Sequence, residues 1–292
     1  MHSNAWDIGT IIVKAVVYAA TLGAAGGLFF LHYCRTQIPN LTRRHTRRLV
    51  AILILVALGC SLVRIPLLSA SMSGEAAGML DPNLAMMIWH SGEGHASAVR
   101  MVGMILAAFA VASSRQTGAV PILGAGIAAT SFAWTGHVHA LRPDWLPIVL
   151  IGVHLLGIAF WLGALPPLLM LTHDPDRAAM VASVRQFGTL AVIVVAVLVT
   201  AGAVLLWMLT GNLTQLWASA YGRALSVKIG LVALLLAVAA FNKLILTPRL
   251  SGGDPQAVSA FRRTLVIEMI AAAAILLGTA TLTTLLEPPA LG

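Results

Sequence analysis

Apolar residues fill eight stretches of the chain, and polar residues gather in the shorter segments between them. Each stretch has about the 20 apolar residues that a helix needs to cross the roughly 30 Å hydrocarbon core of a bilayer. The pattern predicts eight transmembrane helices, at about residues 8–32, 49–68, 95–113, 119–138, 147–170, 187–209, 222–243 and 264–286. We therefore expect an all-α, polytopic membrane protein that forms a single integral membrane domain over residues 1–292.

Two Asp-Pro pairs predict helix starts, because an aspartate can cap a helix and proline suits the first helical position. Asp81-Pro82 predicts a short helix over residues 84–90 that lies at the membrane surface. The polar residues 91–94 then separate it from the third span. Asp254-Pro255 predicts the start of the last helix.

The composition agrees with this fold class. Of all residues, 59% are hydrophobic and 10% are charged, and the mean hydropathy is +0.92. Soluble proteins carry about 25% charged residues, so these values exclude a soluble enzyme and a nucleic-acid-binding domain. The two cysteines, Cys34 and Cys60, lie in or beside apolar runs and predict no disulfide framework.

Basic residues predict the orientation, because Lys and Arg stay on the cytoplasmic side of a membrane. With the N-terminus outside, the outer loops hold only Arg142, and both termini are periplasmic. The cytoplasmic loops then hold Arg35, Arg43, Arg44, Arg47, Arg48, Arg115, Arg177, Arg185, Lys243, Arg249, Arg262 and Arg263. Glu268 lies about one turn inside the last span, and we expect it to pair with Lys243, Arg262 or Arg263 for structural reasons.

A weak internal similarity predicts a parallel repeat of four plus four helices, with halves at about residues 1–139 and 140–292. Residues 94–100 match residues 222–228 in glycine, alanine, valine and basic positions, so that Arg100 corresponds to Lys228. Tyr18 and Gly27 likewise correspond to His154 and Gly163. The first and third spans would then be equivalent to the fifth and seventh.

Histidines and methionines gather near the predicted outer face of the membrane. Imidazole and thioether groups at the edge of an oxidising compartment suit copper better than hard cations. The predicted ligands of a copper ion are His90, His95, His137, His139 and His154, with Met101 and Met104 one to two turns below His95. On a straight helix His95 points nearly opposite the two methionines, so these three residues cannot all bind one ion.

Four segments together resemble the CopD/PcoD family of bacterial copper-resistance inner-membrane proteins. They are His154…Trp161-Leu162-Gly163, Tyr221-Gly222-Arg223…Lys228, Asn242-Lys243…Thr247-Pro248-Arg249-Leu250, and Arg263…Glu268. The resemblance implies an inner-membrane protein with eight helices that transports copper from periplasm to cytoplasm. It also implies a separate periplasmic chaperone of the CopC type as partner, and it marks His154, Trp161 and Lys228 as motif positions.

Two alternatives to copper transport stay open. Histidines on neighbouring helices could supply the axial ligands of a haem, as in membrane redox proteins of the cytochrome b type. A copper sensor or assembly factor that does not transport would have the same sequence features. In each case we expect a protein that is not an enzyme. The chain has no P-loop and no cytoplasmic domain that could hold ATP, so we do not expect it to act as a primary pump on its own.

Overall fold

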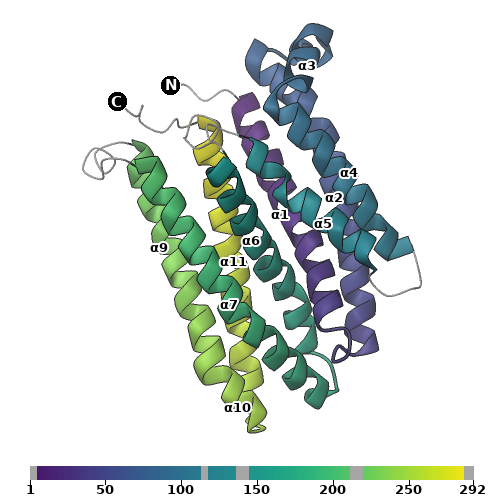
Figure 1. Ribbon diagram of the computed structural model, residues 1–292, viewed down its shortest axis with the longest axis vertical. Coiled ribbons are helices and arrows are strands. Elements are labelled where there is room, and N and C mark those ends of the chain that lie inside the picture. Colours follow the sequence, from purple (N-terminus) through teal and green to yellow (C-terminus); the bar gives the residue numbers. More distant parts are fainter. Residues whose placement is uncertain (1–4, 113–117, 136–144, 211–219, 286–292) are drawn as a thin grey trace.

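A computed structural model describes residues 5–112, 118–135, 145–210 and 220–285, and all regular secondary structure in these ranges is helical. Figure 1 shows long helices side by side in one bundle, with α3 at one end and α10 at the other. We call these the α3 end and the α10 end. The elements are α1 (Ala5–Tyr33), α2 (Asn40–Ser73), η1 (Ala76–Leu80), α3 (Pro82–Trp89), α4 (Gly92–Ala112), α5 (Ala119–Thr130), η2 (Ser131–Trp134), α6 (Trp145–Leu171), α7 (Arg177–Thr210), α9 (Ala220–Phe241), η4 (Asn242–Leu246), α10 (Thr247–Ser251) and α11 (Pro255–Leu285).

Six helices in the described ranges are long and apolar enough to cross a membrane. They are α1, α2, α6, α7, α11 and the continuous helix that runs from α9 through η4 and α10. The prediction of an all-helical, multi-pass protein is thus confirmed. α4 has 21 residues but starts with several polar ones, and α5 has only 12 residues before the 3₁₀ turn of η2. The count of eight spans therefore stays a prediction.

The long helices present apolar side chains outward. Leu55 of α2 is 69% exposed, Ile193 of α7 is 61% exposed and Ile270 of α11 is 65% exposed. Side chains of this kind on the outside of a bundle match the hydrocarbon of a lipid bilayer. The helices extend beyond the predicted apolar runs, and α2 begins at Asn40 because its basic first turns can stay helical in the polar headgroup region.

Both Asp-Pro predictions are confirmed. The Asp81 carboxylate accepts hydrogen bonds from the backbone N–H groups of Asn83 at 2.8 Å and Leu84 at 3.4 Å, at the start of α3. The Asp254 carboxylate accepts one from the backbone N–H of Gln256 at 2.9 Å, at the start of α11. α3 ends at Trp89 and α4 begins at Gly92, so a break is present at residues 90–91, whereas residues 92–94, which the sequence predicted to be part of it, belong to α4.

The tightest contact between helices joins α1 and α6. A Cβ atom added to Gly26 would lie 1.7 Å from the backbone oxygen of Ala159 and 2.8 Å from the Cα atom of Gly163. Gly23 and Gly27 face α2 instead, where an added Cβ would meet Leu53 at 3.2 Å and Val50 at 2.7 Å respectively. Small residues thus let two backbones touch within one bundle.

The start of α1 and the end of α11 lie together at the α3 end (Figure 1). The Lys14 ammonium of α1 donates a hydrogen bond to the backbone oxygen of Thr283 at 3.1 Å and contacts the hydroxyl of Thr284 at 3.4 Å, both on α11. This contact closes the bundle by joining its first helix to its last.

Candidate functional site

Methionine side chains are exposed on a small cap at the α3 end, which we define as residues 72–91 and call the α3 cap. Met72, Met86 and Met87 are 57%, 60% and 51% exposed, and His90 at the end of α3 is also exposed. Exposed thioethers beside an imidazole are the groups that bind a soft ion such as Cu(I). The cap therefore offers soft ligands at the α3 end of the bundle.

Charged side chains lie buried just below the cap, between α1, α2 and α4. Arg64 Nε of α2 lies 2.7 Å from Glu93 Oε1 of α4, and the two side chains are only 5% and 21% exposed. Lys14 and Arg100 are also buried, and both interact electrostatically with this pair. Three cations thus surround one carboxylate, which makes the interior of this end positive.

Arg100 is the most buried of these cations, at 1% exposure. Its guanidinium carbon lies 4.2 Å from the centre of the Phe132 ring, which is a cation–π geometry. Its Nε donates to the Ser131 hydroxyl at 3.3 Å, while its two terminal nitrogens are buried without a hydrogen-bond partner in the described ranges. Tyr18 packs edge-on against the same Phe132 ring at 4.7 Å.

His154 lies half-buried on α6 and faces α7. Its Nδ1 lies 3.1 Å from the backbone oxygen of Leu198, so Nδ1 carries the proton and Nε2 is left as the ligand atom. A Cβ atom added to Gly202 would lie 3.2 Å from the imidazole Cε1, so α7 leaves room for this ring through a glycine. Lys228 of α9 is the charged residue that acts on His154 electrostatically.

The other predicted ligands lie apart from His154. His90 and His95 are exposed at the α3 end, Met101 is half-buried, and Met104 is fully buried in the core that α1, α4 and α5 share. α4 packs on α2 and α5, whereas His154 contacts α7. Within the described ranges no three His, Cys, Asp or Glu side chains gather closely enough to hold a metal ion, and His137 and His139 lie outside those ranges.

A second polar cluster lies nearer the α10 end, and the sequence did not predict its partners. The Glu268 carboxylate of α11 is buried and accepts hydrogen bonds from Trp161 Nε1 of α6 at 3.1 Å and from Asn242 Nδ2 of η4 at 2.5 Å. The expected ion pair with Lys243, Arg262 or Arg263 is therefore wrong. Arg262 turns to Thr172 instead, Lys243 lies along α7 at Gly188, and Arg263 is exposed.

The signal for this cluster was present in the motifs. Trp161, Asn242 and Glu268 come from three of the four segments on which the family resemblance rests, and the fold brings them into direct contact. Sequence separations of 107 and 26 residues hide the contact in the sequence, and both donors are neutral, whereas the expected partner of a buried carboxylate is a cation.

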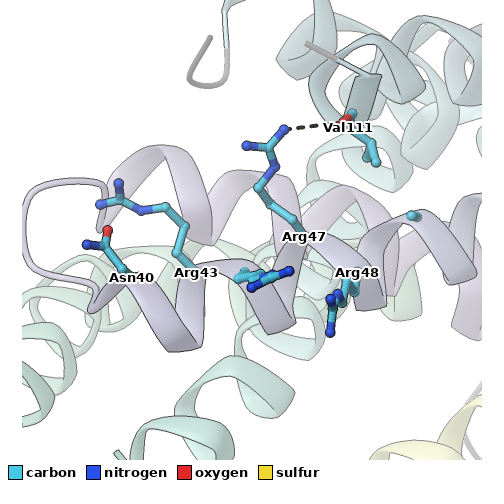
Figure 2. Close-up of a pocket in the computed structure, with 7 residues that line it drawn as sticks. Asn40, Arg43, Arg47, Arg48 and Val111 are labelled. Atoms are coloured by element: carbon cyan, nitrogen blue, oxygen red, sulfur yellow. Dashed lines mark hydrogen bonds between the residues drawn. The ribbon is translucent and has the colours of Figure 1, made fainter. Parts of the chain in front are cut away.

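A basic groove marks the surface of the α10 end (Figure 2). It has a volume of about 350 Å³ and is lined by Asn40, Arg43, Arg44, Arg47, Arg48, Ala51 and Val111. An Arg47 terminal nitrogen donates to the backbone oxygen of Val111 at 3.2 Å, and one of Arg43 donates to that of Arg35 at 2.6 Å. The groove thus concentrates positive charge at one end of the bundle.

Comparison with known proteins finds two matching families. The chain matches the copper resistance protein D-like N-terminal domain over residues 4–142 and copper resistance protein D over residues 181–282. It is 25% identical to the copper transport protein CutJ of Bacillus subtilis over 98% of this chain, but spans about half, 54%, of that relative. It is 28% identical to copper resistance protein D of Pseudomonas syringae, over 79% of this chain and 80% of that relative. No solved structure matches the chain.

Proposed function

The chain belongs to the copper resistance protein D family, and on that premise we propose that it transports copper ions across the bacterial inner membrane from periplasm to cytoplasm. It is a copper-related, multi-pass membrane protein. The observation that carries the proposal is the match of both halves of the chain to copper resistance domains. A transporter role without catalysis agrees with the names of the two relatives.

The orientation proposed for transport puts the α3 end in the periplasm and the α10 end in the cytoplasm. The basic groove at the α10 end supports it, because cytoplasmic borders of membrane proteins are rich in Lys and Arg. Both termini are then periplasmic. Reporter fusions at Asp174 and Asp254 should read cytoplasmic, and a fusion at Gly74 should read periplasmic. The reverse pattern would refute the direction of transport proposed here.

Copper entry is proposed to begin at the α3 cap. The exposed methionines and His90 would receive the ion from a periplasmic chaperone of the CopC type, and acidic Glu75 and Asp81 beside them would attract a cation. Soft ligands placed in steps let an ion enter and leave again. Binding of such a chaperone should weaken when Met86 and Met87 are both replaced by leucine, which keeps their bulk and removes the thioethers.

Deeper ligands are proposed to be His90 or His95, His137 or His139, and His154, with Met101 or Met104 below them. Nε2 of His154 is available because Nδ1 is held by Leu198. Met104 is fully buried, so it would reach an ion only when α4 moves relative to α1 and α5.

A parallel repeat is also proposed, and the packing supports it. The expected equivalent residues Gly27 and Gly163 lie on either side of the closest crossing, between the equivalent helices α1 and α6. The pair α1–α11 has its equivalent in the pair α6–α5, and both pairs are in contact. Arg100 interacts electrostatically with Tyr18 in one half, and its expected equivalent Lys228 interacts electrostatically with His154, the expected equivalent of Tyr18, in the other half. Each half would thus hold one cation beside one aromatic ring.

The experiment that tests transport is copper uptake into proteoliposomes that contain the purified protein. His154→Ala should lower uptake at least about tenfold while the protein level stays normal, since losing a ligand or its support commonly costs 10–100-fold. His45→Ala, at an exposed position of α2 near the α10 end, is the matched control and should leave uptake unchanged. Copper binding that survives both His154→Ala and a combined His95 and His137 replacement would refute this ligand set.

A further inference from the structure

The Glu268 carboxylate lies inside the bundle without a cation beside it. It is 3% exposed, and both of its hydrogen-bond donors, the Trp161 indole and the Asn242 amide, are neutral. Ionised carboxylates within membrane spans are rare, and they usually pair with a cation or mark an ion or proton pathway. In the described part of the chain this carboxylate has no ion pair, so we interpret it as part of an ion or proton pathway.

The neighbours of Glu268 hold it in one geometry. The Thr264 hydroxyl lies 2.6 Å from Asn242 Oδ1 and 2.9 Å from the backbone oxygen of Phe261, and the Asn242 amide turns its NH₂ group toward Glu268. Asn242 and Trp161 then donate to different carboxylate oxygens. This arrangement serves the ionised form, because each oxygen accepts and neither needs to donate.

The backbone that carries Asn242 is also unusual. η4, at Asn242–Leu246, is a π-helical turn inside an otherwise α-helical segment, and such turns occur frequently at functional sites. The Asn242 carbonyl accepts from both the backbone N–H and the hydroxyl of Thr247, the latter at 2.8 Å. The wider turn therefore places the Asn242 side chain toward α11 while its backbone stays satisfied.

Other titratable or charged groups lie on the elements around Glu268, but none is hydrogen-bonded or ion-paired to it in the described ranges. Lys243 extends along α7, Arg262 is bound to Thr172, and Trp161 is about two turns, roughly 10 Å, along α6 from His154. The remaining groups on packed elements are Asp7, Lys14, Tyr18, His32 and Tyr33 of α1, Arg223 and Lys228 of α9, Arg249 of α10 and Arg263 of α11. A lone carboxylate with oxygen and nitrogen neighbours is a poor copper site, because copper prefers several imidazole or sulfur ligands.

We propose that Glu268 is a reversible proton-binding site, held by Trp161 and Asn242, and that its protonation is coupled to copper movement. The step is the loss of one proton from the carboxylic acid to give the carboxylate, with no change of redox state. The proton is bound from the water at one end of the bundle and released to the water at the other end as copper moves. This coupling rests on the proposed transport function, whereas the proton binding does not.

Proton binding is tested by infrared difference spectroscopy of the purified protein during a pH titration. The wild type should show the carbonyl band of a buried carboxylic acid, and the band should be absent from Glu268→Gln. Trp161→Phe keeps an aromatic ring and removes the N–H donor, so the midpoint of the titration should rise by about one pH unit. Glu75→Gln, an exposed glutamate at the α3 end, should leave the band unchanged. A band that persists in Glu268→Gln would overturn the proposal.

Coupling is tested in proteoliposomes with the membrane potential clamped at zero and a gradient of one pH unit imposed. With one proton moved per copper ion, the copper accumulation ratio should change about tenfold in the wild type and not in Glu268→Gln. Equal responses in both proteins would refute the coupling. A wild type that takes up no copper would refute the transport function instead, and the infrared titration would still decide whether Glu268 binds a proton.

Discussion

Replacing Gly26 by alanine should separate the two helices at the centre of the bundle. The added Cβ would lie 1.7 Å from the Ala159 oxygen, and heavy atoms essentially never approach a Cβ closer than 3.0 Å. α1 and α6 must therefore move apart by about 1.3 Å at this point. The obstacle is backbone on both sides, so no side-chain rotation can relieve the clash.

The loss of stability follows from the contacts that this separation opens. A gap of about 0.5–1 Å already forfeits a quarter to a half of the dispersion energy of the atoms that line it. Ala159 lies at the crossing, and Ala24, Ala25 and Ala164 of the same two helices are, like it, fully buried. Overpacking usually costs about 1–3 kcal/mol and occasionally more. We expect about 3 kcal/mol here, because rigid backbone receives the clash.

The assay is thermal unfolding in detergent, followed by size-exclusion chromatography of the remaining monodisperse protein. Gly59→Ala is the matched control, because a Cβ at Gly59 of α2 would meet no atom within 4 Å. Alanine there should keep or raise Tm, since glycine disfavours a helix by about 1 kcal/mol relative to alanine. Gly163→Ala should lower Tm as Gly26→Ala does, and the double variant should lose less than the sum. Equal Tm values for Gly26→Ala and Gly59→Ala would refute the reasoning.

Three further outcomes are expected. Glu93→Gln should lower the free energy of unfolding by about 3–5 kcal/mol, because it leaves several buried cations without their carboxylate. Arg64→Met should lower it less, and equal losses in equilibrium unfolding would contradict this. Asp81→Ala should lose about 1 kcal/mol of helix-cap energy and raise hydrogen exchange in α3 alone, so that exchange spreading through the bundle would argue against a local role. Burial raises the pKa of the Cys34 thiol to about 12, so maleimide labelling of folded protein should stay slow from pH 7 to pH 9 and become fast after denaturation in SDS; rapid labelling at pH 8 would show that the thiol is accessible.

Local signals predicted local structure well. Asp81-Pro82 and Asp254-Pro255 each start a helix because a carboxylate and a proline satisfy the first turn without help from the rest of the fold. Apolar runs likewise predicted long membrane-type helices, because hydrocarbon selects for length and composition alone. The family resemblance also held, and it marked segments rather than the contacts between them.

Contacts between helices that are distant in the chain could not be predicted from the sequence, because they depend on how each helix is rotated about its own axis. Gly23 and Gly27 face α2 while Gly26 meets α6, and only the rotation of α1 in the fold shows which glycine takes part in which contact. Glu268 was expected to take a cation, yet rotation of α11 brings it to Trp161 and away from Arg262. The predicted gathering of histidines depended on similar rotations, and it stays a prediction.

α1 begins and α11 ends at the α3 end, so any domain linked to either of these helix ends would be attached at that end of the bundle. Lys14 fastens the two helices there, so a domain linked before Ala5 or after Leu285 would start its path on the same side as the exposed methionines. A relative about twice as long as this chain, such as the Bacillus protein, could thus carry its extra segment within reach of the α3 cap from either end. Tethering a metal-delivering domain in this way would replace a diffusive encounter with a high local concentration, and the architecture allows it without any rearrangement of the helices.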